Sequence, residues 1–185
     1  MREETDSKSL VRISLIDVMY GVVLAYGFGF YDQADTAIDY IRFFFAYAVI
    51  ITDWIYVHSL YWGWEYKYNS FLLLDIGILF TISRLLHAST VGHSSYYWLW
   101  MSILFLLYVI WDILSKQKKL PSKYDWRYSI SGDLFAAIVF LAFHVFFSKG
   151  ILPYSIFFNT ILIIFYIVII RLTWFKLIKS KESIA

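Results

Sequence analysis

The sequence contains no cysteine and only two prolines, and 16% of its 185 residues are charged. Without cysteine, the chain can have neither a disulfide framework nor a thiolate metal site. Its four histidines show no paired spacing of the kind that binds a metal ion. Glycine-rich phosphate loops and the sequence motifs of metalloproteases and serine hydrolases are also missing. We therefore expect no enzyme, no metal site and no cofactor.

Apolar residues dominate the chain, at 61% of the sequence with a mean hydropathy of +0.64. A soluble domain has about 45–50% apolar residues, and a membrane-spanning helix needs about 20 of them in a row. The six stretches that qualify are residues 11–31, 38–62, 69–88, 96–115, 130–149 and 151–172. We predict an all-α polytopic membrane protein with six transmembrane helices in a single domain, residues 1–185. The N-terminus lacks the pattern of a cleaved signal peptide, so the first helix is expected to stay in the membrane.

Basic residues mark the predicted cytoplasmic side, because Lys and Arg accumulate in cytoplasmic loops. They occur in the N-terminal segment, between spans two and three, in the loop at 116–129 and in the C-terminal tail. Lys149 is the only basic residue in a loop on the opposite side. This distribution predicts that both termini are cytoplasmic. It also predicts that anionic lipid headgroups gather near residues 116–127 and that nucleic acid is not a partner.

Several polar residues lie at one predicted level near the cytoplasmic ends of spans one to three. Asp17 and Asp75 each lie about six residues into a span, a depth that follows from the helical rise of about 1.5 Å per residue. His58 on span two lies at a similar depth, and Trp54 shares its helix face. Arg12 lies just below and can reach a carboxylate. This polar network either locks three helices together or borders a hydrated cavity that ions or protons enter, and the two roles are compatible.

A second group of charged residues lies near the outer ends of spans two and three. Asp39 and Arg42 are three residues apart on one helix face, and Arg84 on span three can reach Asp35 or Asp39. We expect this outer charge cluster (Asp35, Asp39, Arg42 and Arg84) to be held together by structural ion pairs.

The second half of the chain offers fewer polar candidates. Asp112 and Asp133 lie near the cytoplasmic ends of spans four and five, where a side chain can reach interfacial water. His144 is a lone imidazole on an apolar helix, and we expect it to be a packing residue rather than a ligand or a proton relay.

The polar positions of spans one to three form a recognisable pattern. Arg12 precedes Leu-Ile-Asp-Val at residues 15–18, Trp54 and His58 follow on span two, and Asp75 lies near the start of span three. This pattern resembles the lysosomal and endosomal potassium channels of animals and their prokaryotic relatives, which are built from six-span units. That family has an arginine and Phe-Ser-Asp-Gly in span one, Trp and His in span two, and Asn in span three. The resemblance implies a homo-oligomer, a tetramer in the family, with span one lining the pore.

The family selects and gates ions with rings of large apolar side chains on span one. Carried over by position from Asp17, the resemblance places these pore-lining rings at Val22, Tyr26 and Gly29, which share one helix face. Tyr26 would place a ring of phenol groups where the family has large aliphatic side chains. We expect a hydrophobic constriction that gates by dewetting, with these phenol groups at its narrow part. The predicted function is an oligomeric channel for monovalent cations, with potassium as the family's ion, in the plasma membrane of a prokaryote.

Two other functions stay open. A proton-coupled secondary transporter would use Asp17, Asp53 and Asp75 as protonation sites, although six spans without a visible repeat are few for alternating access. A non-conducting scaffold subunit would instead need a protein partner. Saturable uptake would favour the transporter, and the absence of ion flux would favour the scaffold.

Overall fold

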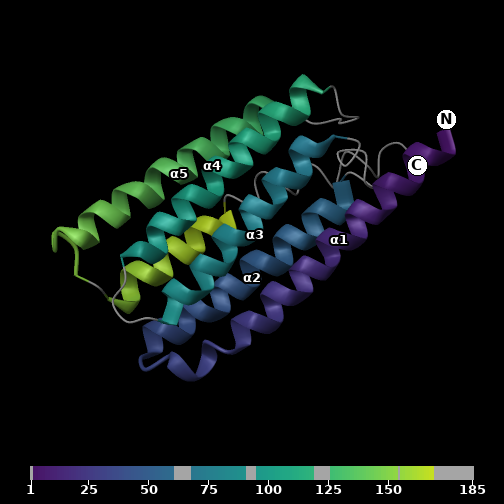
Figure 1. The fold of residues 1–185 in the computed structure, drawn as a ribbon. Helices are drawn as coiled ribbons and strands as arrows, with labels where there is room; N and C mark the ends of the chain where they lie inside the picture. The colour runs from purple at the N-terminus through teal and green to yellow at the C-terminus, as the bar shows by residue number, and fades with distance from the viewer. Residues whose placement is uncertain (1, 61–67, 91–94, 119–125, 154, 169–185) are drawn as a thin grey trace. The chain divides into compact units, whose positions relative to one another are not determined.

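The computed structural model describes residues 2–60, 68–90, 95–118, 126–153 and 155–168 (Figure 1). For residues 2–10, 56–60 and 126–128 it describes the backbone alone. The chain divides into two compact units, Met1–Ser94 and Ser95–Ala185, and each unit has its own packed helices.

The first unit is built from three long helices. They are α1 (Arg2–Phe28), α2 (Ala37–Leu60) and α3 (Asn69–Thr90), and a 3₁₀ turn, η1 (Tyr31–Gln33), follows α1. The helices lie side by side in Figure 1, where α1 packs against α2 and α3, and α2 packs against α3. Because the α1–α2 connection is short, these two helices run antiparallel, and α3 returns in the direction of α1.

The start of α2 is fixed by a reciprocal pair of side-chain caps. The Thr36 backbone N–H and hydroxyl donate to Asp39 Oδ2 at 3.1 and 2.7 Å, and the Asp39 backbone N–H donates to Thr36 Oγ1 at 3.3 Å. This is the geometry of a capping box, in which the first backbone N–H groups of a helix find side-chain acceptors. The chain direction on entering α2 is therefore set by two residues.

Gly27 allows the three helices of this unit to approach closely. It is buried on α1, and a Cβ atom built there would lie 2.6 Å from the Tyr47 hydroxyl on α2 and 2.7 Å from Leu86 Cδ1 on α3. The Tyr47 hydroxyl is held in place because it donates to the Leu24 carbonyl at 2.7 Å. Only glycine fits this contact without a shift of its neighbours.

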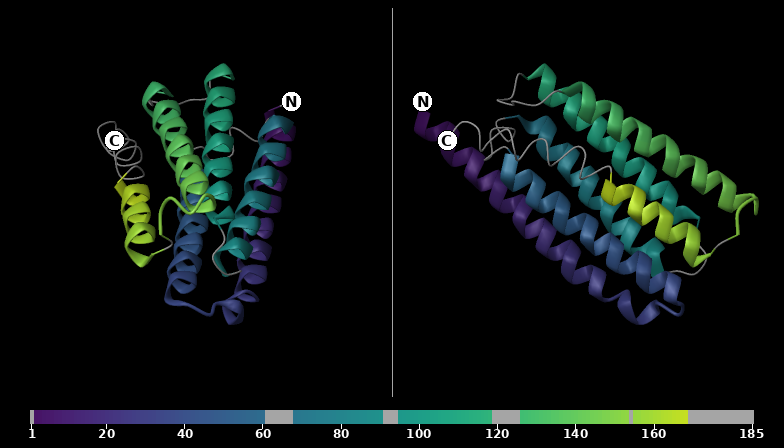
Figure 2. Two further views of the ribbon diagram at one scale, coloured as in Figure 1. Left: turned by 90° about the vertical axis from the view of Figure 1, so that its left-hand side faces the viewer. Right: turned by 180° about the vertical axis from the view of Figure 1, so that it is seen from behind.

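The second unit contains α4 (Tyr96–Gln117), α5 (Trp126–Ser148) and a shorter helix, Ile156–Val168. α4 and α5 pack along each other over their length (Figure 2). Trp98 stacks on Phe140 with ring centroids 5.7 Å apart, and the Ser102 hydroxyl donates to the Ala137 carbonyl at 2.8 Å. Aromatic stacking and this buried hydrogen bond together fix the register of the two helices.

α5 ends at a left-handed glycine. Gly150 has φ +66°, its N–H donates to the Phe147 carbonyl at 3.1 Å, and the Ile151 N–H donates to the Phe146 carbonyl at 2.9 Å. These two bonds form a Schellman motif, which needs a residue without a Cβ at its left-handed position. The chain then turns into the helix Ile156–Val168, where the Asn159 side-chain amide donates to the Ser155 carbonyl at 2.8 Å.

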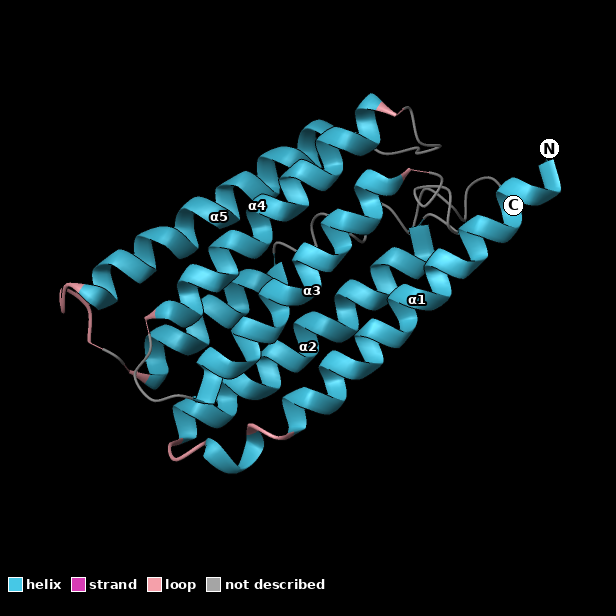
Figure 3. Ribbon diagram, viewed as in Figure 1, coloured by secondary structure: helices cyan, strands magenta, loops and turns pink. Residues whose placement is uncertain are grey.

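The described residues form helices and no strand, which confirms the predicted all-α class (Figure 3). Among the described residues, the segments long and apolar enough to cross a membrane are Val11–Gln33, Asn69–Thr90, Tyr96–Gln117 and Ser129–Ser148. α2 covers the predicted second span and carries three charged residues, Asp39, Arg42 and Asp53. The predicted sixth span, 151–172, contains a shorter described helix, and its last residues lie outside the description. The protein is therefore a membrane-embedded helical protein, and six spans stay a prediction.

Candidate functional site

The structure brings together two members of the predicted polar network, Asp17 and Trp54. The Trp54 indole N–H donates to Asp17 Oδ1 at 3.0 Å, and this bond links α1 to α2. Asp17 is partly buried, whereas Trp54 is 41% exposed. An indole donor suits a carboxylate acceptor at this depth because it satisfies one charged oxygen and still presents an apolar ring to its surroundings.

A second polar pair lies one turn further along the same interface. The Tyr20 hydroxyl donates to Asp53 Oδ2 at 2.5 Å, and both side chains are buried. From the sequence, Asp53 is expected only as a protonation site of a transporter, and Tyr20 has no predicted role. The spacing of the residues could have predicted this pair, because Tyr20 lies one turn beyond Asp17 on α1 and Asp53 is adjacent to Trp54 on α2.

The remaining predicted network residues lie on three helices. Arg12 Nη2 donates to the Asn69 side-chain oxygen at 2.7 Å, which joins α1 to the start of α3. Asp75 is buried on α3, six residues beyond Asn69. His58 belongs to α2, but its side chain lies outside the described part of the structure. Because α1 and α3 run in the same direction, the Arg12–Asn69 contact places Asp75 close to the depth of Asp17, as the residue count predicts.

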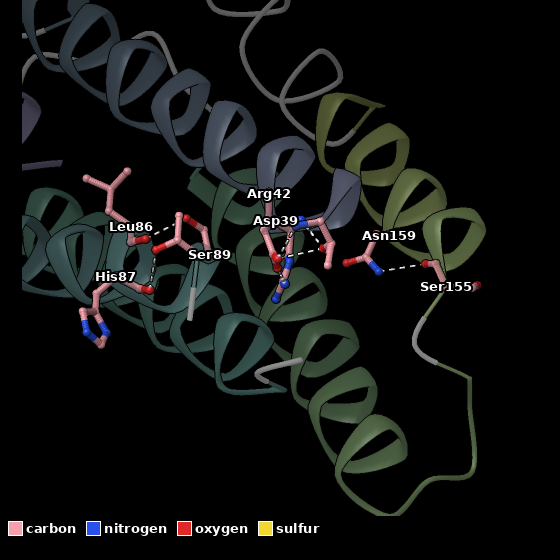
Figure 4. Close-up of polar contacts among 9 residues, drawn as sticks. Asp39, Arg42, Leu86, His87, Ser89, Ser155 and Asn159 are labelled. Carbon is pink, nitrogen blue, oxygen red and sulfur yellow. Dashed lines mark hydrogen bonds and ion pairs between the residues drawn. The ribbon is translucent and has the colours of Figure 1, made fainter. Parts of the chain in front are cut away.

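The predicted outer charge cluster contains a buried ion pair at the start of α2. Arg42 Nη2 contacts Asp39 Oδ1 at 2.5 Å, and Figure 4 shows the two side chains pointing toward each other on α2. Asp39 also caps the helix through Thr36, so its carboxylate both starts α2 and neutralises Arg42. Asp35 and Arg84 have exposed side chains, and the structure assigns the ion pair of Asp39 to Arg42.

At the C-terminal end of α3, side-chain hydroxyls bond to carbonyl groups of the last turns. Ser89 Oγ donates to the Leu86 carbonyl at 2.6 Å, and Thr90 Oγ1 donates to the His87 carbonyl at 3.3 Å (Figure 4). The His87 ring packs edge-on against Phe30, with centroids 5.1 Å apart. These contacts give His87 a packing role at the end of the helix.

The three predicted pore-lining residues lie on a different side of α1 from Asp17 and Tyr20, which contact α2. Val22 and Tyr26 are 61% and 60% exposed, and Gly29 is exposed as well. The Tyr26 ring meets Phe30 edge-on at 5.0 Å, which holds it along the helix. This face is available to another copy of the chain, to lipid or to a water-filled path.

His144 takes the packing role expected for it. Its Nδ1 lies 2.9 Å from the Ser95 carbonyl, and its ring tilts against Tyr96 with centroids 5.8 Å apart. Within the described ranges, no three His, Cys, Asp or Glu side chains come close enough to hold a metal ion.

Comparison of the chain with protein-family models, with curated proteins and with solved structures gives no match. The resemblance of spans one to three to a channel family therefore stays a prediction from sequence, and function has to be argued from the residues themselves.

Proposed function

We propose that this protein is the subunit of an oligomeric cation channel in which α1 lines the ion path. The observation that carries the proposal is the contrast between the two faces of α1. One face is held by polar contacts to α2, made by Asp17 and Tyr20. The other face carries the exposed side chains of Val22 and Tyr26. A pore helix needs this combination, because it must be fixed on one side and open on the other.

The exposed face of α1 also has the spacing of a helix that surrounds an axis. Six of the exposed residues of α1 recur at alternating separations of four and three residues. They are Val11, Leu15, Val18, Val22, Ala25 and Gly29. This heptad spacing keeps one seam of a helix directed at neighbouring parallel helices. Gly21, Ala25 and Gly29 follow one another at four-residue intervals, and such small residues let helices in a membrane approach closely.

The proposed ion path has an apolar throat and polar groups at its inner end. Val22, Tyr26 and Gly29 form the narrow part, which gates by losing water when the apolar surfaces come together. Asp17 attracts cations toward the inner mouth and is positioned by Trp54. The wider proposal is six spans, cytoplasmic termini, a prokaryotic plasma membrane and a tetramer, as the positive-inside pattern and the resemblance imply.

Single-cysteine variants test the proposal cleanly because the chain has no cysteine of its own. Val22→Cys places a thiol on the proposed pore face of α1. Leu73→Cys is the matched control, since Leu73 is a 69% exposed aliphatic residue on α3. Purified protein in liposomes is assayed for K⁺, Na⁺ and H⁺ flux before and after a charged, water-soluble thiosulfonate reagent. We expect the reagent to reduce cation flux through Val22→Cys at least about tenfold and to leave Leu73→Cys unchanged, because only an aqueous thiol ionises and reacts. The reagent could instead react equally with both variants, or react with Val22→Cys without reducing its flux. Either result would exclude α1 as the lining of the ion path.

The buried carboxylates favour one alternative function, a proton-coupled transporter. Asp53 with its Tyr20 partner and Asp75 lie buried inside the first unit, where a carboxylate can exchange a proton during transport. This function predicts saturable uptake that depends on a pH gradient and is abolished by Asp53→Asn. A channel predicts non-saturating flux that survives Asp53→Asn. A pure oligomer that carries no ions at all would support the scaffold instead.

A further inference from the structure

Four buried side chains of the second unit each have one polar atom without a hydrogen-bond partner in the described part of the chain. These atoms are Trp98 Nε1, Asp112 Oδ2, Ser115 Oγ and Asn159 Oδ1. The sequence predicts that Asp112 reaches interfacial water, and this prediction is wrong, because its side chain is 3% exposed. Asp112 and Ser115 lie at least about 20 Å along α4 from Trp98, so neither can bond to the Trp98 indole.

Ring contacts fix the register of the shorter helix, Ile156–Val168, against α4. Phe105 on α4 meets Tyr166 edge-on, with ring centroids 5.9 Å apart. Phe165 meets Phe140 of α5 at 5.9 Å, so the shorter helix runs back along α5 after the turn between them (Figure 2). α4 is also antiparallel to α5, and the shorter helix therefore runs parallel to α4.

This register places Trp98 opposite Asn159. Trp98 lies seven residues before Phe105 on α4, and Asn159 lies seven residues before Tyr166 on the shorter helix. Seven residues are about two helical turns, so each step returns to the same helix face about 10 Å further along. Because the two helices are parallel, both steps lead to the same level. The contact between the Phe105 and Tyr166 rings is therefore repeated, two turns away, by an indole and an amide.

The unpartnered atoms of these two side chains are chemically complementary. Trp98 and Asn159 are both 0% exposed. The Asn159 amide nitrogen donates to the Ser155 carbonyl at 2.8 Å, which leaves the amide oxygen as an acceptor (Figure 4). The Trp98 indole N–H is a donor only, and its ring is fixed by the stack on Phe140. A buried donor and a buried acceptor are each costly in apolar surroundings unless a hydrogen bond compensates them.

We propose that Trp98 Nε1 and Asn159 Oδ1 bind one neutral, hydroxyl-bearing molecule of the size of water between α4 and the shorter helix. The oxygen of this molecule accepts a hydrogen bond from the indole N–H, and its O–H group donates to the amide oxygen. A metal cation would be repelled by the N–H donor and an anion by the amide oxygen, so the pair selects a neutral group. The full burial of both side chains limits the occupant to a water molecule, which needs two to four polar partners in a protein interior. This bridge holds the shorter helix at one rotation against α4, and it does not depend on an ion path along α1.

The test detects the bound water by NMR on the purified full chain in detergent, with ¹⁵N-labelled tryptophan. The chain has eight tryptophans, and Trp98→Phe identifies the Trp98 indole signal by its loss. We expect a cross-relaxation peak between the Trp98 indole proton and the water resonance, with the sign of a bound water and not of proton exchange. Asn159→Leu removes the acceptor and should abolish this peak. Thr160→Leu, which changes the exposed neighbouring residue, should retain it.

Thermal unfolding of the same samples tests whether the water joins the two side chains. Trp98→Phe should lower the Tm by about 2–4 °C less in the Asn159→Leu chain than in the parent, because the bridge is already lost there. The proposal is overturned if the parent shows no water peak, if the peak persists in Asn159→Leu, or if the two Tm changes are additive. Coupled Tm changes without a water peak would mean that the indole and the amide bond directly. If Asn159→Leu does not fold, the measurement on the parent still decides. Absence of ion flux in liposomes would overturn the channel proposal and leave this site intact.

Discussion

Replacing Gly27 by alanine should destabilise the first unit, although the same substitution stabilises most helices. The new methyl group would lie 2.6 Å from the Tyr47 hydroxyl and 2.7 Å from Leu86 Cδ1. Leu86 is fully buried, and the Tyr47 hydroxyl is held by its 2.7 Å hydrogen bond to the Leu24 carbonyl. Both neighbours must move before the methyl group fits, so α1 has to separate from α2 and α3.

The magnitude follows from three terms of known size. Overpacking a close contact costs about 1–3 kcal/mol. Moving Tyr47 away from the Leu24 carbonyl costs about 1 kcal/mol for the weakened hydrogen bond. Alanine regains about 1 kcal/mol relative to glycine through helix propensity. The net loss for Gly27→Ala is about 1–3 kcal/mol, which lowers the Tm of a chain of this length by about 2–12 °C.

Thermal unfolding in detergent, followed by tryptophan fluorescence, measures this effect against a matched control. Gly77→Ala is the control, because nothing lies within 4 Å of a Cβ atom at Gly77 on α3, and it should leave the Tm unchanged or slightly higher. Tyr47→Phe removes the nearest obstructing atom, so it should reduce the cost of Gly27→Ala by about 1 kcal/mol in a double-mutant cycle. If Gly27→Ala and Gly77→Ala unfold at the same temperature, or if Tyr47→Phe leaves the cost unchanged, the close approach at Gly27 does not hold this unit together.

Two polar contacts give further predictions from the same assay. Tyr20→Phe removes the hydrogen bond to the buried Asp53 carboxylate and should cost about 1–3 kcal/mol, whereas Tyr26→Phe, on an exposed ring, should change the Tm little. Equal Tm values for these two variants would contradict the Tyr20 contact. Arg42→Met leaves the buried Asp39 charge without its ion pair and should cost about 3–5 kcal/mol, much of which Asp39→Asn in the same chain should restore. If the double variant is as unstable as Arg42→Met, the loss comes from packing and not from charge.

Hydropathy was sufficient to locate the described helices, because each one contains a long apolar stretch. α3 begins at Asn69 and α4 at Tyr96, as the sequence predicts, since polar residues precede both stretches. α1 begins at Arg2 instead of Val11, because residues 2–10 are polar and helical, and hydropathy detects only the apolar part of a helix. α2 was also predicted as a span, although its charged residues make it less apolar than the other long helices.

Residue counting gives the depth of a side chain in the membrane but not its direction. It predicts Asp17, His58 and Asp75 at one level, whereas the α2 residue that contacts Asp17 is Trp54, one turn before His58. Which side chain faces which depends on how two helices pack, and this is why the Tyr20–Asp53 and Arg12–Asn69 contacts were not foreseen. Gly21 and Gly27 show the same limit. They look alike in sequence, yet only Gly27 lies between neighbouring helices.

The paired contacts between α1 and α2 have a consequence for motion. Trp54 donates to Asp17 and Tyr20 donates to Asp53, so two hydrogen bonds join adjacent residues of α2 to residues about one turn apart on α1. A slide of α1 by one residue, about 1.5 Å and 100°, would rotate both hydrogen bonds out of alignment together. Small translations of α1 along α2 are therefore disfavoured, because a single shift breaks both hydrogen bonds at once.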